Sequence, residues 1–222
     1  MLYDAGLGGL PTSQGWLYLT DPSGGASATQ AMGSGFAQLD TTPMRDDSAG
    51  YFRTFPGLNR TAGYTVGFQA RIDAENHGNN DRAGFSVIAL GSDNLGVELA
   101  FWEDWIWAQD SAFTHAEQTA FDTTDTLTEY ALAIAGNSYT LSANGLPVLS
   151  GPLRNYPDVA HPVYGLTNFL FFGDDTGSAA ARIELVSIEV LIPEPSSAVL
   201  ALLAGLLAAI FRRRFARLKY PA

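Results

Sequence analysis

The side chains best suited to chemistry lie close together in the sequence FWEDWIWAQD, residues 101–110. Indole rings stack on the apolar faces of sugar rings, and carboxylates accept hydrogen bonds from sugar hydroxyls. The candidate carbohydrate-binding residues are therefore Trp102, Glu103, Asp104, Trp105 and Trp107, with His115 from a neighbouring segment. A structural alternative remains open, in which two core strands turn at Glu103-Asp104 and the tryptophans fill the core.

Carboxylates in the same region raise the alternative of a glycoside hydrolase, which needs two carboxyl groups about 5 to 9 Å apart across a cleft. The candidate acids and bases are Glu98, Glu103, Asp104 and Glu117. In one extended strand Glu98 and Asp104 would lie about 20 Å apart. The adjacent Glu103 and Asp104 would point in opposite directions unless they form a turn. No catalytic pair is recognisable, so the sequence favours a protein that is not an enzyme.

Two loops rich in Asp and Asn are candidate sites for Ca²⁺, which prefers carboxylate and amide oxygens. The segment GDDTGS supplies Asp174 and Asp175, and the segment NHGNNDR supplies Asn79 and Asp81. Turns use the same residue types for their own backbone hydrogen bonds, so plain turns are the alternative. The sequence has no Gly-x-Ser-x-Gly elbow, and its three histidines show no metal-binding spacing.

The charge of the chain is unevenly distributed. The formal net charge is −11, yet five of the twelve basic residues follow residue 211. The first 192 residues contain seven arginines, no lysine and 22 acidic residues, which makes their net charge −15. Such a surface repels nucleic acid, so we exclude a nucleic-acid partner. The absence of cysteine excludes disulfide bonds and thiolate chemistry.

Alternation of apolar and polar residues predicts β-strands throughout residues 1–191. Asn144-Gly145 favours a two-residue hairpin turn, and Gly136-Asn137 favours another. The strand candidates are GWLYL, ATQAM paired with FAQLDT, GYFRTF, YTVGFQARI, AGFSVIAL, GVELAFW, WIWAQ, YALAI, NFLFF and ARIELVSIEVL. Before residue 198 no amphipathic helix of more than about ten residues is recognisable. So many strands predict two packed antiparallel sheets, a β-sandwich.

The order of strands and turns from residue 130 to residue 149 carries a resemblance. The series Tyr-x-Leu-x-Ile, Gly-Asn, Tyr-Thr-Leu, Asn-Gly, Pro-Val-Leu resembles a hairpin of concanavalin A-like lectin/glucanase jelly rolls. NDRAGFSVIAL, GVELAFWEDWIWAQ and NFLFFGDDT are similar to the bodies called choice-of-anchor domains. The resemblance implies an all-β jelly-roll sandwich over residues 1–191 and no settled activity. The Glu-x-Asp-x-x-Glu motif of laminarinase-type glucanases is absent.

The C-terminal segment has the composition of a sorting signal. Pro193, Glu194 and Pro195 lie in a linker over residues 192–197, and residues 198–211 form an uninterrupted apolar run. As a helix this run spans about 21 Å. The basic tail, residues 212–222, begins with Arg212, Arg213 and Arg214. Arginine clusters remain on the cytoplasmic side of a membrane, so we expect residues 1–191, called the body below, to lie on the other side.

This arrangement resembles the PEP-CTERM sorting signal of Gram-negative bacteria. The resemblance implies that the hydrophobic helix holds the exported protein in the inner membrane. An exosortase then cleaves near Pro-Glu-Pro and releases the body to the cell surface or the extracellular matrix. The first residues, MLYDAGLGGLPTSQGW, show no export signal. We therefore expect either a signal that this sequence lacks or a true start other than Met1.

Three functional hypotheses follow from the sequence. The first is an exported binding or matrix protein whose body contacts extracellular polysaccharide through the tryptophan segment. The second is a polysaccharide-degrading enzyme with the same fold. The third is a purely structural matrix protein that binds no ligand.

Overall fold

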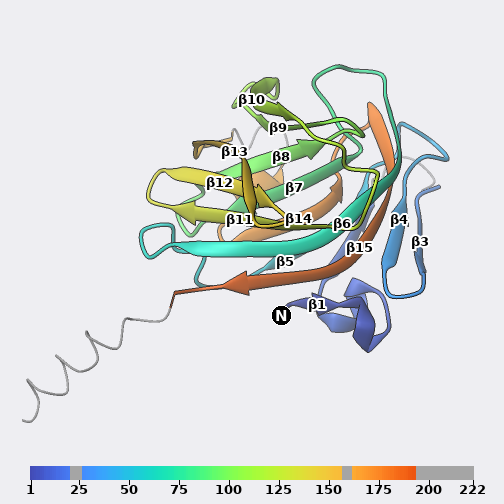
Figure 1. Ribbon diagram of the computed structural model, residues 1–222, viewed down its shortest axis with the longest axis horizontal. Helices are drawn as coiled ribbons and strands as arrows, with labels where there is room; N and C mark the ends of the chain where they lie inside the picture. The colour runs from blue at the N-terminus through green and yellow to red at the C-terminus, as the bar shows by residue number, and fades with distance from the viewer. Residues whose placement is uncertain (21–26, 157–161, 194–222) are drawn as a thin grey trace, which may run out of the picture. The chain divides into compact units, whose positions relative to one another are not determined.

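The computed structural model describes residues 1–20, 27–156 and 162–193. Residues 1–192 form one compact unit of two antiparallel sheets (Figure 1). In the described ranges the helices are three short 3₁₀ turns: η1 (Ala5–Leu7), η2 (Pro11–Gln14) and η3 (Pro162–Gly165). The predicted β-sandwich is confirmed.

The larger sheet has eight strands in the order β13-β12-β11-β6-β15-β4-β3, and β1 also pairs with β15. Its strands are β1 (Tyr3–Asp4), β3 (Thr29–Met32), β4 (Ala37–Asp40), β6 (Tyr64–His77), β11 (Thr128–Ala135), β12 (Ser138–Ala143), β13 (Leu146–Pro152) and β15 (Ala179–Leu191). The predicted turns join β11 to β12 and β12 to β13, where Gly136, Asn144 and Gly145 have positive φ angles.

The smaller sheet has seven strands in the order β10-β9-β8-β7-β14-β5-β2. Its strands are β2 (Leu17–Thr20), β5 (Ala49–Thr54), β7 (Phe85–Leu90), β8 (Gly96–Phe101), β9 (Trp105–Gln109), β10 (His115–Ala120) and β14 (Phe169–Asp174). Neighbouring strands pair in antiparallel register throughout.

The hydrophobic core lies between the two sheets and is rich in aromatic rings. Every second residue of β6 is buried from Tyr64 to Ile72, so one face of this strand forms one wall of the core. Phe68 packs edge-on against Phe101 and Phe172 of the opposite sheet and stacks on Tyr130 of β11. Period-two alternation places these rings on one side of each strand, and their burial drives the two sheets together.

The strands β7, β8 and β14 are buried on both faces. Their inner face packs against the larger sheet, whereas Ile88, Phe169 and Phe171 on the outer face form a second cluster with Tyr156 and Tyr164. Strands covered on both faces have continuous apolar sequences, which explains FSVIAL and FLFF. The smaller sheet therefore has a second layer over its outer face, and the candidate site lies there.

The sorting segment falls largely outside this description. Residues 194–222, which contain Glu194, Pro195 and the three arginines, are not among the described residues. Within the described ranges, no helix is long and apolar enough to cross a membrane.

Candidate functional site

A row of small residues crosses the outer face of the smaller sheet. Cross-strand partners in this row are Ala100 on β8, Ser86 on β7, Gly173 on β14 and Gly50 on β5. A Cβ atom on Gly173 would lie only 2.4 Å from the Cα atom of Gly50, so a larger residue does not fit there. The row itself carries no large side chain, and the neighbouring Phe171 ring packs over Gly50.

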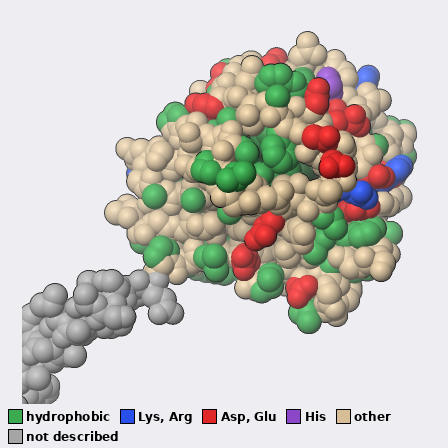
Figure 2. Space-filling view, in the orientation of Figure 1, with side chains coloured by type: hydrophobic (Ala, Val, Ile, Leu, Met, Phe, Trp, Pro, Cys, Tyr) green, Lys and Arg blue, Asp and Glu red, His purple; other side chains and the backbone are tan. Residues whose placement is uncertain are grey.

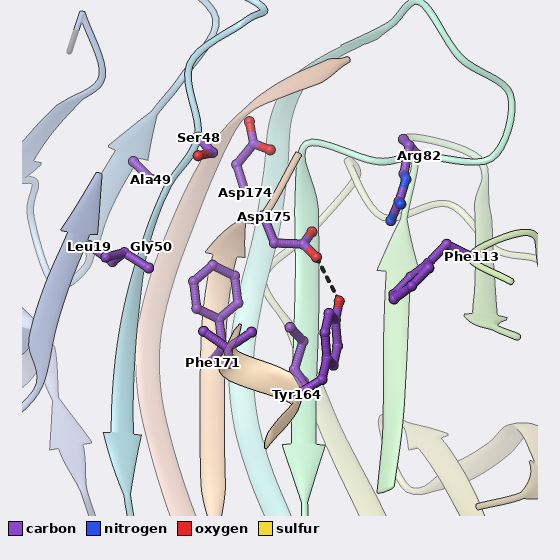
Figure 3. Close-up of a pocket in the computed structure, with 12 residues that line it drawn as sticks. Leu19, Ser48, Ala49, Gly50, Arg82, Phe113, Tyr164, Phe171, Asp174 and Asp175 are labelled. Carbon is purple, nitrogen blue, oxygen red and sulfur yellow. Dashed lines mark hydrogen bonds between the residues drawn. The ribbon is translucent and has the colours of Figure 1, made fainter. Parts of the chain in front are cut away.

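A cavity of about 110 Å³ lies beside this row, and Gly50 is the residue of the row that lines it. Leu19 and Gly50 lie on one side of it and Arg82 and Phe113 on the other, with Phe171 and Asp175 between them (Figure 3). The remaining lining residues are Ser48, Ala49, Ile88, Val163, Tyr164 and Asp174. Aromatic rings and a few charged groups thus converge on one small space, as is typical of ligand-binding sites.

A chain of hydrogen bonds joins the cavity to a buried carboxyl group. The Tyr164 hydroxyl lies 2.6 Å from Glu98 Oε2 and 3.2 Å from Asp175 Oδ2, so it bridges two carboxyl groups. The backbone N–H of Glu98 donates to the hydroxyl of Tyr156, which in turn donates to the carbonyl oxygen of Gln109. These bonds fix both tyrosine rings over β8 and β9.

Glu98 is fully buried, and its Oε1 atom has no hydrogen-bond partner among the described residues. Burial, reinforced by the nearby charge of Asp175, raises the pKa of Glu98 well above its usual value. Burial also raises the pKa of Tyr164, so its hydroxyl stays protonated and remains a donor. Burial therefore favours the neutral acid form of Glu98 over the carboxylate.

Arg82 brings a positive charge to the cavity wall. Its guanidinium carbon lies 4.8 Å from the centre of the Phe113 ring, a cation–π contact, and among the described residues it forms no ion pair within 4.0 Å. The body as a whole is acidic, and Asp and Glu side chains are more prominent than Lys and Arg on the face that Figure 2 shows. The guanidinium of Arg82 therefore brings hydrogen-bond donors to the cavity wall.

A strained loop presents Phe113 to the cavity. Phe113 has φ +61°, which is rare for a bulky residue. Asp110 holds this loop, because its carboxylate accepts hydrogen bonds from the backbone of Ala112 and from the backbone and side chain of Thr114. Those bonds lower the pKa of Asp110. Backbone strain of this kind gathers at functional sites.

The tryptophan segment lies on the same outer face, towards its other edge. The chain turns at Glu103-Asp104 between β8 and β9, as the structural alternative expected. Trp107, however, does not fill the core between the sheets: it forms an outer cluster with Ala83 and Ala100, against which Trp102 and Trp105 pack. The segment of residues 98–104 is therefore not one extended strand.

Trp107 is completely buried, so neither face of its indole is open to a sugar. His115 stacks on Trp107 with ring centres 4.1 Å apart, and His77 stacks on Trp102 at 3.9 Å. Trp102 Nε1 donates to the carbonyl oxygen of Arg82 at 2.8 Å, which ties this cluster to the cavity wall. Trp105 keeps part of its surface in solvent.

The other predicted acids have their own partners or lie in solvent. Glu103 is exposed and accepts a hydrogen bond from the backbone of Glu75, and Asp104 is exposed in the turn. Glu117 forms an ion pair with Arg154 at 2.6 Å and accepts a hydrogen bond from Tyr139. Neither Glu103, Asp104 nor Glu117 lines the cavity.

The calcium candidates are divided between two loops. Asp174 is buried and accepts hydrogen bonds from Thr41 and from the backbone of Thr176, and burial raises the pKa of Asp174 well above its usual value. Asn79 accepts a hydrogen bond from the backbone of Asp81, which closes a turn. Among the described residues, no group of three or more His, Asp or Glu side chains is placed to hold a metal ion.

Several site residues were absent from the sequence-based candidates, namely Arg82, Phe113, Tyr156 and Tyr164. Glu98 was named only as an acid of the alternative enzyme. A signal for Glu98 was present, since a single carboxylate interrupts the apolar strand GVELAF. A carboxyl group at such a position must be buried with a partner. The partner, Tyr164, comes from a loop 66 residues away, which the strand pattern does not predict.

Comparison with known proteins shows the fold. No protein-family model and no curated sequence matches the chain. The exoplasmic/lumenal domain of VIP36 in its Ca²⁺- and Man2-bound form is 11% identical, with a TM-score of 0.50 over 85% of this chain and 86% of that one. An alginate lyase from Corynebacterium sp. is 10% identical, with a TM-score of 0.47 over 77% of this chain and 83% of that one. The body therefore has a concanavalin A-like jelly-roll fold.

Proposed function

We propose that the body is a carbohydrate-binding module and that the cavity on the outer face of the smaller sheet is its binding site. The observation that carries the proposal is the convergence of Arg82, Asp175 and the rings of Phe113, Tyr164 and Phe171 on one cavity. The half-buried ring of Phe113 can cover the C–H face of a sugar, whereas Tyr164 and Phe171, each 3% exposed, form the wall behind it. A guanidinium and a carboxylate donate to and accept from the sugar hydroxyls.

Hydrolysis of a polysaccharide is the second candidate, and the raised pKa of Glu98 beside Asp175 favours it. Two features count against it. Glu98 is fully buried, and the hydroxyl of Tyr164 occupies the space between the two carboxyl groups. A glycosidic oxygen does not fit between them in this arrangement, so we prefer binding to cleavage.

The binding proposal is tested by screening the protein against a glycan array and titrating each hit by calorimetry. Arg82→Ala removes a charged donor, and such hydrogen bonds contribute about 1.5–3 kcal/mol, so we expect the affinity to fall by roughly 10- to 100-fold. Arg45→Ala is the matched control, because Arg45 is exposed and does not line the cavity. Absence of glycan binding, or equal affinities for the two variants, would refute the proposal.

The calcium expectation is a separate part of this proposal. Ca²⁺ would use oxygens of Asp174 and Asp175, or of Asn79 and Asp81. Thermal unfolding with Ca²⁺ and with a chelator tests it. A Ca²⁺ site raises the melting temperature in a concentration-dependent way, and that rise should be lost in Asp175→Asn or in Asp81→Asn.

We also propose that the C-terminal segment is a sorting signal, with an exosortase-type enzyme and the inner membrane as its partners. The support is the order of Pro193-Glu194-Pro195, the apolar run and Arg212-Arg213-Arg214. Replacing the Pro-Glu-Pro residues by alanine should leave the protein in the membrane fraction. Release of this variant into the medium at the normal rate would show that the segment is not a sorting signal.

A further inference from the structure

Tyrosine and phenylalanine rings fill the outer face of the smaller sheet beside the cavity. Phe113, Tyr156 and Tyr164 pack against one another with ring centres 5.2 to 5.9 Å apart. Tyr156 and Tyr164 are each only 3% exposed, and their hydroxyls bond to β8 and β9. In the described part of the chain, these rings therefore occupy the outer face of β8 that an extended polysaccharide would need to cross.

The cavity is also bounded by structure on its other sides. Leu19 of the edge strand β2 and Ser48 just before β5 form one boundary, and Asp174 and Asp175 at the end of β14 form another. Its volume of about 110 Å³ is well below the ~300–1,000 Å³ typical of sites for larger ligands. The space is on the scale of one sugar ring, not of two linked rings.

The polar groups are arranged around the cavity instead of along a line. Arg82 offers donors on one side, Asp175 offers acceptors between the walls, and Ser48 offers a hydroxyl from the opposite side (Figure 3). A terminal sugar unit exposes hydroxyls at the position where an internal unit is linked to the next unit. Donors and acceptors on several sides of a small, partly open cavity therefore match a chain end.

We propose that the cavity binds one terminal sugar unit of a glycan and does not bind internal segments of a polysaccharide. The inference rests on the proposed carbohydrate-binding function and specifies its ligand. It follows that the affinity depends on the number of accessible chain ends, and that free monosaccharides compete with the polymer.

The test is a calorimetric series with one sugar type that binds on the array, in lengths from one to six units. Binding at a single end predicts dissociation constants within about threefold across the series, since added units make no further contacts. A ligand capped at its terminal hydroxyls should lose binding. A rise in affinity of tenfold or more with length would overturn the inference and leave the proposed function intact, whereas failure of every length to bind would refute both.

A pair of variants tests whether the sugar binds in this cavity. Leu19 lines the cavity and is 36% exposed, so Leu19→Trp narrows the cavity from its rim and leaves the core unchanged. Leu17→Trp is the control, because Leu17 lies on the same edge strand, is 60% exposed and does not line the cavity. We expect Leu19→Trp to weaken monosaccharide binding at least tenfold and Leu17→Trp to leave it unchanged. Equal affinities for both variants would place the ligand elsewhere.

Discussion

Replacing Glu98 by Gln removes the titratable proton of the buried carboxyl group and keeps the size and shape of the side chain. Glu98 is 0% exposed, and the groups that face it are Tyr164, Tyr156, Asp175 and Arg82. Burial raises its pKa, so the folded protein keeps the proton over a pH range in which the unfolded chain, with an ordinary glutamate pKa near ~4.3, has released it.

The sign of the pH dependence follows from this difference. Above about pH 4 the folded state binds more protons at this position than the unfolded state does, so the free energy of unfolding falls as the pH rises. For one proton the fall is roughly 1 kcal/mol per pH unit, until the pH reaches the pKa of Glu98 in the folded state. Glu98→Gln carries no such proton, so its free energy of unfolding should fall less steeply by that amount.

The assay is urea unfolding of the wild type and Glu98→Gln at pH 5, 6 and 7. We expect the variant to gain stability relative to the wild type as the pH rises towards the pKa of Glu98 in the folded state. Glu103→Gln is the matched control. Because Glu103 is exposed, the free energy of unfolding of this variant should depend on pH in the same way as that of the wild type. Asp174 is also buried with a raised pKa, so it gives the wild type a pH dependence that both variants keep. Parallel curves for Glu98→Gln and the wild type would refute the reasoning.

Three further variants test the packing around the site. Tyr164→Phe removes the donor to Glu98, and we expect a loss of about 1–3 kcal/mol in urea unfolding. Gly173→Ala should prevent normal folding, because its Cβ atom would lie 2.4 Å from the Cα atom of Gly50 on β5, and near-UV circular dichroism should be lost. Gly136→Ala is the control: its Cβ atom would have nothing within 4 Å, so the variant should fold and its free energy of unfolding should fall by only about 1 kcal/mol. Leu99→Ala, at a fully buried position, should cost about 2–5 kcal/mol in the same urea assay, and a loss under 1 kcal/mol would contradict its place in the core.

Strand positions and hairpin turns were predictable from the sequence because their causes are local. Alternation along YTVGFQARI marks the buried face of β6, and Asn144-Gly145 adopts the positive φ angles that its two-residue hairpin requires. The acidic charge of the body and the composition of the C-terminal segment are likewise properties of the sequence alone. Two packed antiparallel sheets follow from the number of strands.

The candidate site was only partly predictable, because pairing between distant strands builds it. The turn at Glu103-Asp104 was one of two alternatives from the sequence, and the burial of Trp107 on the outer face depends on His115 and Trp102 packing over it. The cavity lies beside the row of small residues in which β5, β7, β8 and β14 meet, and these strands are spread over more than 120 residues of sequence. No local pattern identifies that register.

The sequence by itself therefore determined the all-β body, its turns, its charge and the expectation of a sorting signal. Only the tertiary structure brought Tyr164 to Glu98 and placed Arg82 and Phe113 on the wall of the cavity that Gly50 also lines. The physical reason is that hydrophobic alternation specifies which face of a strand is buried, while strand order and register decide which side chains meet on that face.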